Sequence, residues 1–305
     1  MNGPLRGPGT DHSHYGFQPI AGRAAFTWPA GKTVSFSIVI LLEHIELYPP
    51  PESIQAPLSG GVMGSQFPFP NMPLLTQWDY GLRVGLFRIG DLLDGLALPS
   101  AIAIDAMTAE RYPFIVEFCR KRGMEFIAHG ISASRIISGK MSETEERNYI
   151  GESLRRIRSA TGGTITGWCG PAQSESTITP YLLDEAGLDY VLDWPNDEQP
   201  YFMNTIHKLV SLPPLFALDD AYFLLNRAGT SDDYCKSITV AFDRMTGDAS
   251  NGARSMILLI RPWLTGQPFR IHALETSLSH IAANATAWKA TPSEVQTVFR
   301  ETQAV

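Results

Sequence analysis

The chain has 305 residues, of which 44% are hydrophobic, and its 24 Lys and Arg residues face 31 Asp and Glu residues, for a formal net charge of -7. This is the composition of an ordinary globular protein, and the length allows one large α/β domain or two smaller ones. The acidic balance argues against nucleic acids and membranes as partners, because a nucleic acid or an anionic membrane surface would need a basic face.

The cysteines and the apolar runs indicate the cellular compartment of the protein. Cys119, Cys169 and Cys235 lie far apart and outside any CxxC pattern, so we expect neither a disulfide framework nor a cysteine-bound structural zinc. The first residues lack the apolar core of a secretory signal, and no apolar run approaches the ~20 residues of a membrane span. We therefore expect a soluble, cytoplasmic protein.

Along the chain, short apolar runs alternate with helical segments. Residues 1–29 form an N-terminal arm rich in Gly, Pro and His, and we expect residues 30–305 to form a single domain. Residues 48–77 are rich in proline and are predicted to form a long packed loop. Near-continuous apolar runs with Val and Ile are typical of strands buried on both faces of a parallel sheet. Such runs occupy residues 35–42, 100–104, 124–128, 164–168, 188–194, 208–212 and 255–260.

The helices between these runs carry recognisable start signals. Ser142 and Glu145 have the spacing of a capping box, and residues 291–294 (Thr-Pro-Ser-Glu) give a second helix start. Further helices are expected over 109–122 and 177–186, each followed by glycine. Alternation of this kind predicts an α/β fold, specifically a distorted (β/α) barrel.

In a parallel α/β fold, ligands bind beyond the carboxyl ends of the strands. Polar, titratable or aromatic residues follow six of the predicted strands, so we expect them to converge on one mouth. We assign catalysis to four of them and substrate binding to the other eight. The catalytic candidates are Glu43, Asp105, His129 and Arg261, and the binding candidates are His44, Glu46, Ser132, Ser134, Trp168, Pro171, Trp194 and Trp263.

The catalytic candidates differ in the chemistry that they offer. Glu43 and His129 can both carry a proton near neutral pH, which makes them candidates for general acid and base. Arg261 ends a buried strand, where a fixed positive charge suits an anion or a carbonyl oxygen. Which of Glu43 and His129 is the acid and which the base stays open.

Several candidates also have a structural interpretation. Asp105 either takes part in the chemistry or caps the following helix. Ser132 and Ser134 either bind substrate or make hydrogen bonds within a turn. Trp168 and Trp194 either wall a flat ligand or belong to the core.

Five stretches carry a family resemblance over most of the chain from about residue 28. They are WPAGKTVSFSIVILLEHIE, DYGLRVGLFRIGDLL, AERYPFIVEFCRKRGMEFIAHG, GWCGPAQSESTITPYLLDEAGLDYVLDWPNDEQPY and RPWLTGQPFRIHALETSLSHI. They resemble the polysaccharide deacetylase (NodB-like) superfamily, in particular its branch with metal-independent allantoinases and cyclic imide hydrolases. The resemblance implies a distorted barrel, hydrolysis of a C–N bond and a homo-oligomer.

The resemblance also bears on metal binding. Superfamily members with a metal use an Asp on the first strand and a His-x-x-x-His pair, whereas here His129 is followed four residues later by Ala133 and the first-strand acid is Glu43. A catalytic zinc normally needs three protein ligands, so no cofactor is favoured, and zinc held by Glu43 and His129 is the alternative. Relatives carry histidine at the position of Arg261, and we expect Arg261 to pair with Asp105.

Together these features predict a hydrolase that opens a cyclic amide, imide or ureide, with Glu43 and His129 as the acid–base pair and a small molecule as substrate. One alternative is a metal-dependent N-deacetylase of a carbohydrate. Another is a diverged homologue that binds a ligand or catalyses a non-hydrolytic reaction.

Overall fold

A computed structural model describes residues 11–50 and 72–303. In this part of the chain, a nine-stranded sheet has the order β6-β7-β5-β4-β3-β2-β1-β8, with β9 also paired to β1. All pairings are parallel except that of β6 with β7. The strands are β1 (Val34–Leu42), β2 (Ser100–Ile104), β3 (Glu125–Ala128), β4 (Gly167–Trp168), β5 (Tyr190–Val191), β6 (Tyr201–Phe202), β7 (Val210–Ser211), β8 (Arg254–Ile260) and β9 (Ala287–Lys289).

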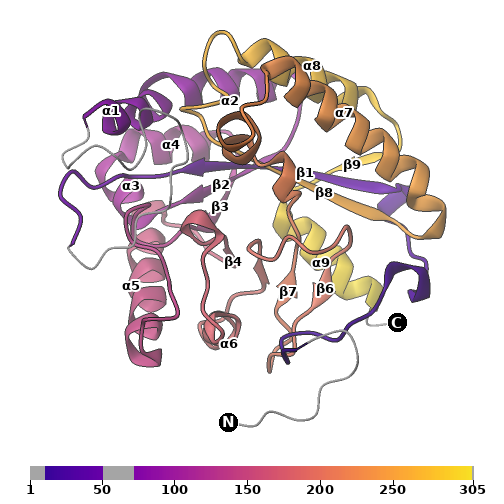
Figure 1. The fold of residues 1–305 in the computed structure, drawn as a ribbon, viewed down its shortest axis with the longest axis horizontal. Coiled ribbons are helices and arrows are strands. Elements are labelled where there is room, and N and C mark those ends of the chain that lie inside the picture. Colours follow the sequence, from indigo (N-terminus) through magenta and orange to yellow (C-terminus); the bar gives the residue numbers. More distant parts are fainter. Residues whose placement is uncertain (1–10, 51–71, 304–305) are drawn as a thin grey trace.

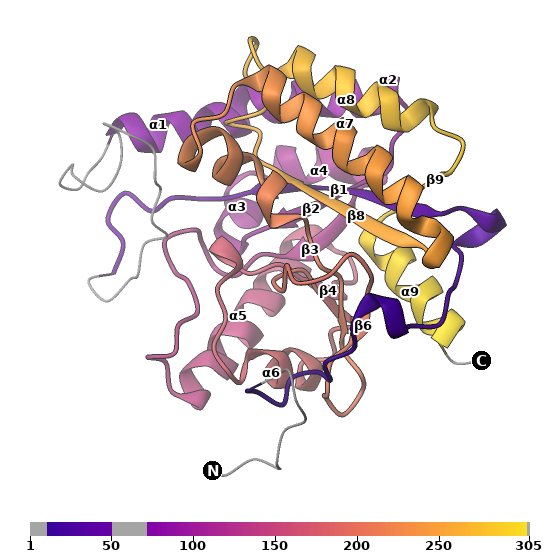
Figure 2. The same cartoon turned by 45° about the vertical axis from the view of Figure 1, so that its right-hand side comes forward.

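Helices cover the outside of this curled sheet, and one helix lies on its inner side. Figure 1 shows α2, α7 and α8 above β1 and β8, while α9 lies on the opposite side of these strands. The helices are α1 (Met72–Tyr80), α2 (Leu86–Gly95), α3 (Ala106–Arg111), α4 (Pro113–Lys121), α5 (Glu143–Thr161), α6 (Thr179–Glu185), α7 (Ser231–Asp248), α8 (Ile271–Ala283) and α9 (Pro292–Gln303). The predicted distorted barrel is confirmed, and Figure 2 shows its open, curled sheet from a second side.

The core consists of two apolar layers on the two faces of the sheet. In β1, Ile40 and Leu42 belong to the layer shared with the outer helices, whereas Val39 and Leu41 belong to the inner layer. Every residue of β1 is buried, and full burial of each such side chain is worth roughly 1.5–3 kcal/mol. Because side chains alternate along a strand, the residue that follows Leu42, Glu43, continues on the inner side.

The predicted strands are present, although some are much shorter than their apolar runs. The runs over 164–168 and 188–194 pair only at β4 and β5, two residues each, and β6 and β9 were not predicted. The helix predicted over 109–122 is wrong as a single helix, because Pro113 disfavours a helical conformation at the residue before it. Tyr112 accordingly adopts φ -125° and ψ 65° between α3 and α4.

Of three further local predictions, two are confirmed and one has a wrong end. The capping box of Ser142 and Glu145 is confirmed at the start of α5, and the predicted helix over 177–186 appears as α6. The loop predicted over 48–77 falls largely outside the described residues, but its end is wrong, since residues 72–77 belong to α1.

The described part of the N-terminal arm lies along the seam between β6 and β8. The Phe26 carbonyl accepts a hydrogen bond from the Ala253 N–H, and Trp28 Nε1 donates to the Arg254 carbonyl at 2.7 Å. These contacts extend the edge of the sheet beside β8, so the arm packs onto the barrel here.

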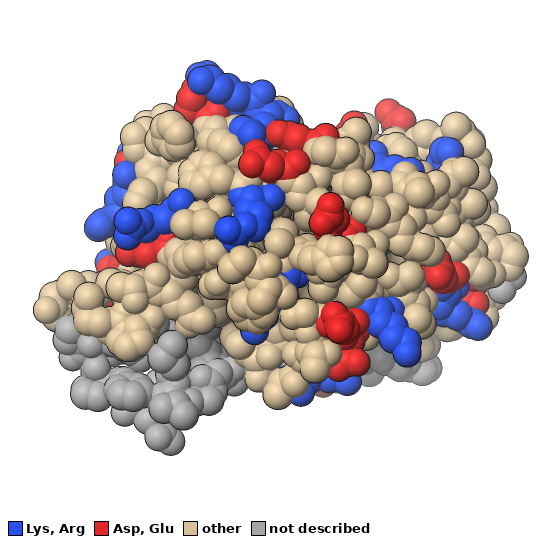
Figure 3. Space-filling model, turned by 90° about the horizontal axis from the view of Figure 1, so that it is seen from above, with Lys and Arg blue, Asp and Glu red and all other residues tan. Residues whose placement is uncertain are grey.

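One face of the molecule carries both signs of charge. On the face that lies above α2, α7 and α8, basic and acidic side chains are interspersed among broad uncharged stretches (Figure 3). No helix in the described ranges combines the length and apolar character that a membrane span requires.

Candidate active site

Three predicted residues meet at the carboxyl ends of the parallel strands. Glu43 follows β1, His129 follows β3, and Arg261 follows β8. His129 Nε2 lies 3.4 Å from Glu43 Oε1, and Arg261 Nε lies 3.5 Å from Glu43 Oε2. Only 7% of Glu43 and 1% of His129 is exposed. The sheet thus holds a carboxylate between an imidazole and a guanidinium, out of bulk water.

The surroundings of Glu43 and His129 set their protonation. Nδ1 of His129 is hydrogen-bonded to the Cys169 carbonyl, which assigns a proton to Nδ1 and turns Nε2 toward Glu43. Burial alone would lower the pKa of His129, but the hydrogen bond and charge of Glu43 outweigh it and raise this pKa. Burial would raise the pKa of Glu43, yet His129 and Arg261 together lower it. Both shifts favour the charged forms, a carboxylate on Glu43 and an imidazolium on His129.

Two adjacent acids hold Arg261 in place. Nη1 of Arg261 donates to Asp219 at 2.9 Å and to Asp220 at 2.9 Å, and its backbone N–H donates to Asp220 at 2.6 Å. Burial outweighs the charge of Arg261 and raises the pKa of Asp220 to about 7. Among the described residues, Nη2 of Arg261 has no hydrogen-bond acceptor.

Asp219 and Asp220 were not predicted from the sequence. They lie between two short helical turns, Phe216–Leu218 and Tyr222–Asn226, outside every predicted strand. The available signal is the Asp-Asp pair inside the apolar stretch FALDDAYF, where two acids need a partner.

The predicted pairing of Asp105 with Arg261 is wrong. The Asp105 carboxylate instead accepts hydrogen bonds from the backbone N–H groups of His44, at 2.5 Å, and Thr108, at 2.6 Å. It is thus the N-cap of α3, as its structural interpretation proposed. Burial raises the pKa of Asp105 to about 7.

Three of the binding candidates bind one another. Glu46 Oε1 accepts from Ser132 Oγ at 2.7 Å and from Arg135 Nε at 2.7 Å, while the Glu46 N–H donates to Ser134 Oγ at 2.9 Å. These contacts brace the loop after β3 against the segment after β1. His44, between the two, is half-buried, and its carbonyl accepts from the Ala133 N–H.

Two of the predicted tryptophans lie in the outer apolar layer. Trp168 is fully buried there, and Trp263 stacks on Trp78 with ring centroids 5.3 Å apart. Pro171 packs beside Gly130, where a Cβ atom would lie 2.8 Å from the proline ring. The structure therefore separates the two tryptophans from the inner face that carries Glu43.

Trp194 is the tryptophan that the N-terminal arm contacts. Its ring centroid lies 5.3 Å from that of His14 and 5.9 Å from that of Tyr15. Its Nε1 donates to Glu175 Oε2 at 2.9 Å. Trp194 thus links the loop after β4 to the described part of the arm.

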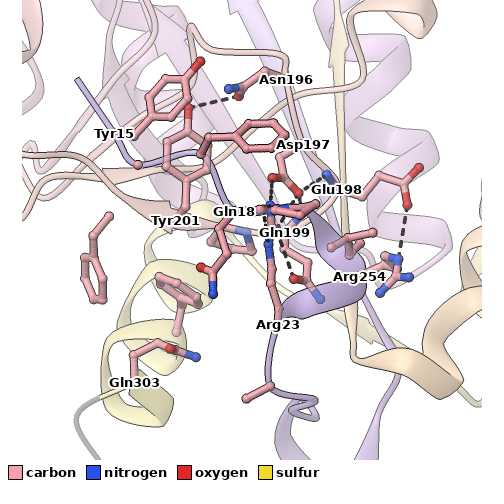
Figure 4. Close-up of a pocket in the computed structure, with 18 of the residues that line it drawn as sticks. Tyr15, Gln18, Arg23, Asn196, Asp197, Glu198, Gln199, Tyr201, Arg254 and Gln303 are labelled. Carbon is pink, nitrogen blue, oxygen red and sulfur yellow. Dashed lines mark hydrogen bonds and ion pairs between the residues drawn. The ribbon is translucent and has the colours of Figure 1, made fainter. Parts of the chain in front are cut away.

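A groove of about 1510 Å³ lies away from the carboxyl strand ends that carry Glu43, His129 and Arg261. The arm and the segment 196–202 line it together with Arg254, and Figure 4 shows Arg23 ion-paired with Asp197 on its wall. Tyr15 and Tyr201 pack edge to face at 5.0 Å along the same wall. None of the twelve site residues predicted from the sequence lines this groove.

The residues at the strand ends do not fit a catalytic metal ion. In residues 11–50 and 72–303, no group of three His, Cys, Asp or Glu side chains could hold a metal ion. Ala133 is buried where a second histidine would follow His129, and the Arg261 guanidinium would repel a cation from Glu43. A catalytic zinc normally has three protein ligands, and these residues supply two.

Fold and site together define an open α/β barrel with a buried Glu43–His129 pair at the carboxyl ends of its strands. Residues 70–191 match the family model described as polysaccharide deacetylase. A Schizosaccharomyces pombe protein, named as a putative polysaccharide deacetylase, is 25% identical over 297 residues, which cover 88% of this chain and 90% of the relative. Over these residues the chain is similar to polysaccharide deacetylases.

Solved structures support the same fold. PuuE allantoinase matches with a TM-score of 0.83 and 22% identity, covering 99% of this chain and 100% of that one. A probable polysaccharide deacetylase from Pseudomonas aeruginosa PAO1 matches with a TM-score of 0.77 and 23% identity, covering 90% and 93%. At these identities the likeness concerns the fold.

Proposed function

We propose that this protein hydrolyses a non-peptide C–N bond and opens a small cyclic amide, imide or ureide. The observation that carries the proposal is the buried Glu43–His129 pair beside Arg261. The allantoinase and deacetylases among the similar structures support a reaction of this class. Free, buried Cys119 and Cys169 support the further proposal of a cytoplasmic location.

Glu43 acts as the base in this proposal. Amide hydrolysis needs an activated water and a proton for the leaving nitrogen. Glu43 Oε2 is buried and accepts no hydrogen bond from the described residues, so it is available to take a proton from water. The water oxygen then forms a bond to the carbonyl carbon, and the π electrons of the carbonyl move to its oxygen.

Arg261 and His129 complete the reaction. Negative charge passes from Glu43 to the former carbonyl oxygen, which Arg261 Nη2 would hold by hydrogen bonding. His129 gives its Nε2 proton to the nitrogen as the C–N bond breaks. After product leaves, Glu43 loses the proton on Oε2 to water and His129 takes up a proton at Nε2, which restores the pair 3.4 Å apart.

The test is a panel of hydantoins, imides and ureides with purified protein and two variants. Glu43→Gln and His129→Asn should each lower kcat/KM by about 10²–10⁴-fold while circular dichroism stays that of the wild type. Glu301→Gln, an exposed change of the same kind on α9, is the matched control. Near-normal turnover by either active-site variant would contradict the proposed mechanism.

Metal-dependent N-deacetylation of a carbohydrate is the second candidate, because the family model is that of polysaccharide deacetylases. The two candidates differ in their response to a chelator. Turnover of cyclic imides that persists in chelator supports ring opening. Turnover of N-acetylated sugars that is lost in chelator and restored by zinc would support deacetylation instead.

A further inference from the structure

The charges around Arg261 are unusual for an arginine that would bind an anion. Its guanidinium contacts three carboxylates, Glu43 at 3.5 Å and Asp219 and Asp220 at 2.9 Å each. The exposed fractions of these three carboxylate side chains are 5%, 7% and 0%. The positive charge of Arg261 is therefore already compensated inside the protein.

The other charged groups nearby do not reverse this balance. His129 is the second cation, and it is paired with Glu43. Asp105 and Asp193 are acids, and both interact electrostatically with His129. With pKa values of about 7, Asp105 and Asp220 are partly protonated near neutral pH, but Glu43 and Asp219 already match the two cations in number. A ligand that brought a further negative charge would therefore find no unpaired cation, in a buried setting where like charges repel strongly.

We propose that the site selects an electrically neutral ring and rejects anions, including its own ring-opened product, and that Asp219 and Asp220 set this selectivity by neutralising Arg261. The inference rests on the proposed ring opening. Arg261 then serves as a hydrogen-bond donor to a neutral carbonyl through Nη2, and not as an ion-pair partner of substrate.

The reaction itself changes the charge of the ligand. Water adds across the C–N bond of a neutral imide or ureide ring, which yields a carboxylic acid and a neutral amide or urea group. The acid loses its proton to solvent near neutral pH, so the product is an anion. Because no unpaired cation attracts this carboxylate while Glu43 and Asp219 repel it, product release is favoured and product inhibition should be weak.

A pair of ligands that differ in charge alone tests this selectivity. Succinamate is the ring-opened product of succinimide, and succinamide replaces its carboxylate by an amide of the same shape. Titrations followed by NMR should give the wild type a dissociation constant for succinamate that exceeds that for succinamide by on the order of tenfold. Asp219→Asn removes one negative charge and should narrow this ratio severalfold. Asp232→Asn, the same change at an exposed position on α7, should leave it unchanged.

The outcomes separate this inference from the proposed function. Equal or tighter binding of succinamate by the wild type, or no binding of either ligand, would overturn the selectivity. An unchanged ratio in both Asp219→Asn and Asp220→Asn, with thermal unfolding confirming that they fold, would overturn the role of the two acids. If both variants unfold, the wild-type ratio decides. Preference for succinamide without turnover of any cyclic imide would contradict the proposed function alone.

Discussion

Replacing Arg261 by methionine tests the electrostatic design of the site most directly. The change removes the guanidinium but keeps an unbranched side chain that can fill much of the same space. Glu43, Asp219 and Asp220 would then keep their burial and lose their shared cation.

The expected loss of stability is large. Removing one partner of a buried ion pair costs roughly 3–5 kcal/mol, a substantial part of the 5–15 kcal/mol that stabilises a typical domain. The stranded acids would escape part of this cost by taking up protons. Their pKa values in the folded variant would then exceed the unfolded values, so the folded state would bind protons more tightly. The variant should therefore be most stable at low pH and lose stability as the pH rises.

Urea unfolding at about pH 5.5 and about pH 8 measures both effects. Arg261→Met should lose about 3–5 kcal/mol relative to wild type at the higher pH and clearly less at the lower pH. Arg244→Met is the matched control, because Arg244 is exposed and pairs with Asp248 one helical turn away, where a salt bridge is worth about 0–1 kcal/mol. A loss below about 1 kcal/mol for Arg261→Met at both pH values would refute the reasoning.

Three further predictions concern activity and stability. Since the proposed mechanism needs the Glu43 carboxylate and the His129 imidazolium, kcat/KM should be level between the ordinary Glu value of 4.5 and the ordinary His value of 6.5, fall below the first and fall above the second; a profile without either fall would contradict the assignment. Gly130→Ala should destabilise the fold by more than about 2 kcal/mol in urea unfolding, because Gly130 has φ +70° and a Cβ would lie 2.3 Å from a tyrosine hydroxyl; Gly139→Ala, which meets nothing within 4 Å, is the control. Ser142→Ala should cost about 1 kcal/mol through loss of the α5 capping box, and an unchanged unfolding midpoint would contradict it.

The three residues that meet could be predicted from the sequence, because the alternation of side chains along each strand continues past the end of the strand. Glu43 continues the inward series of Val39 and Leu41, and Arg261 continues that of Leu259. The same alternation places Trp168 on the other face from its neighbour Cys169, and the structure has it in the outer layer. Attention to alternation at that strand would have separated this tryptophan from the inward-facing candidates.

Other features depend on how the chain folds back in space. Asp219 and Asp220 belong to a segment without a strand, so no periodicity indicates that they reach Arg261. Trp263 would share the inner face with Arg261 if β8 continued, but β8 ends at Ile260 and the chain turns there. Local sequence pattern therefore cannot predict which residues pair with a charged side chain, or where side chains in turns point.

Arg261 and Ala133 both bear on the source of positive charge at this site. A site with three metal ligands obtains its positive charge from the ion, whereas here a buried alanine, Ala133, stands where the third ligand would be and Arg261 supplies the positive charge beside Glu43. The guanidinium stays charged throughout the working range of pH. Unlike a bound metal ion, the guanidinium cannot dissociate from the site. Burying its charge costs free energy, and the ion pairs with Asp219 and Asp220 at 2.9 Å offset that cost. The acids that secure the cation also cancel its attraction for anions, so fixing Arg261 and selecting a neutral ligand are consequences of the same contacts.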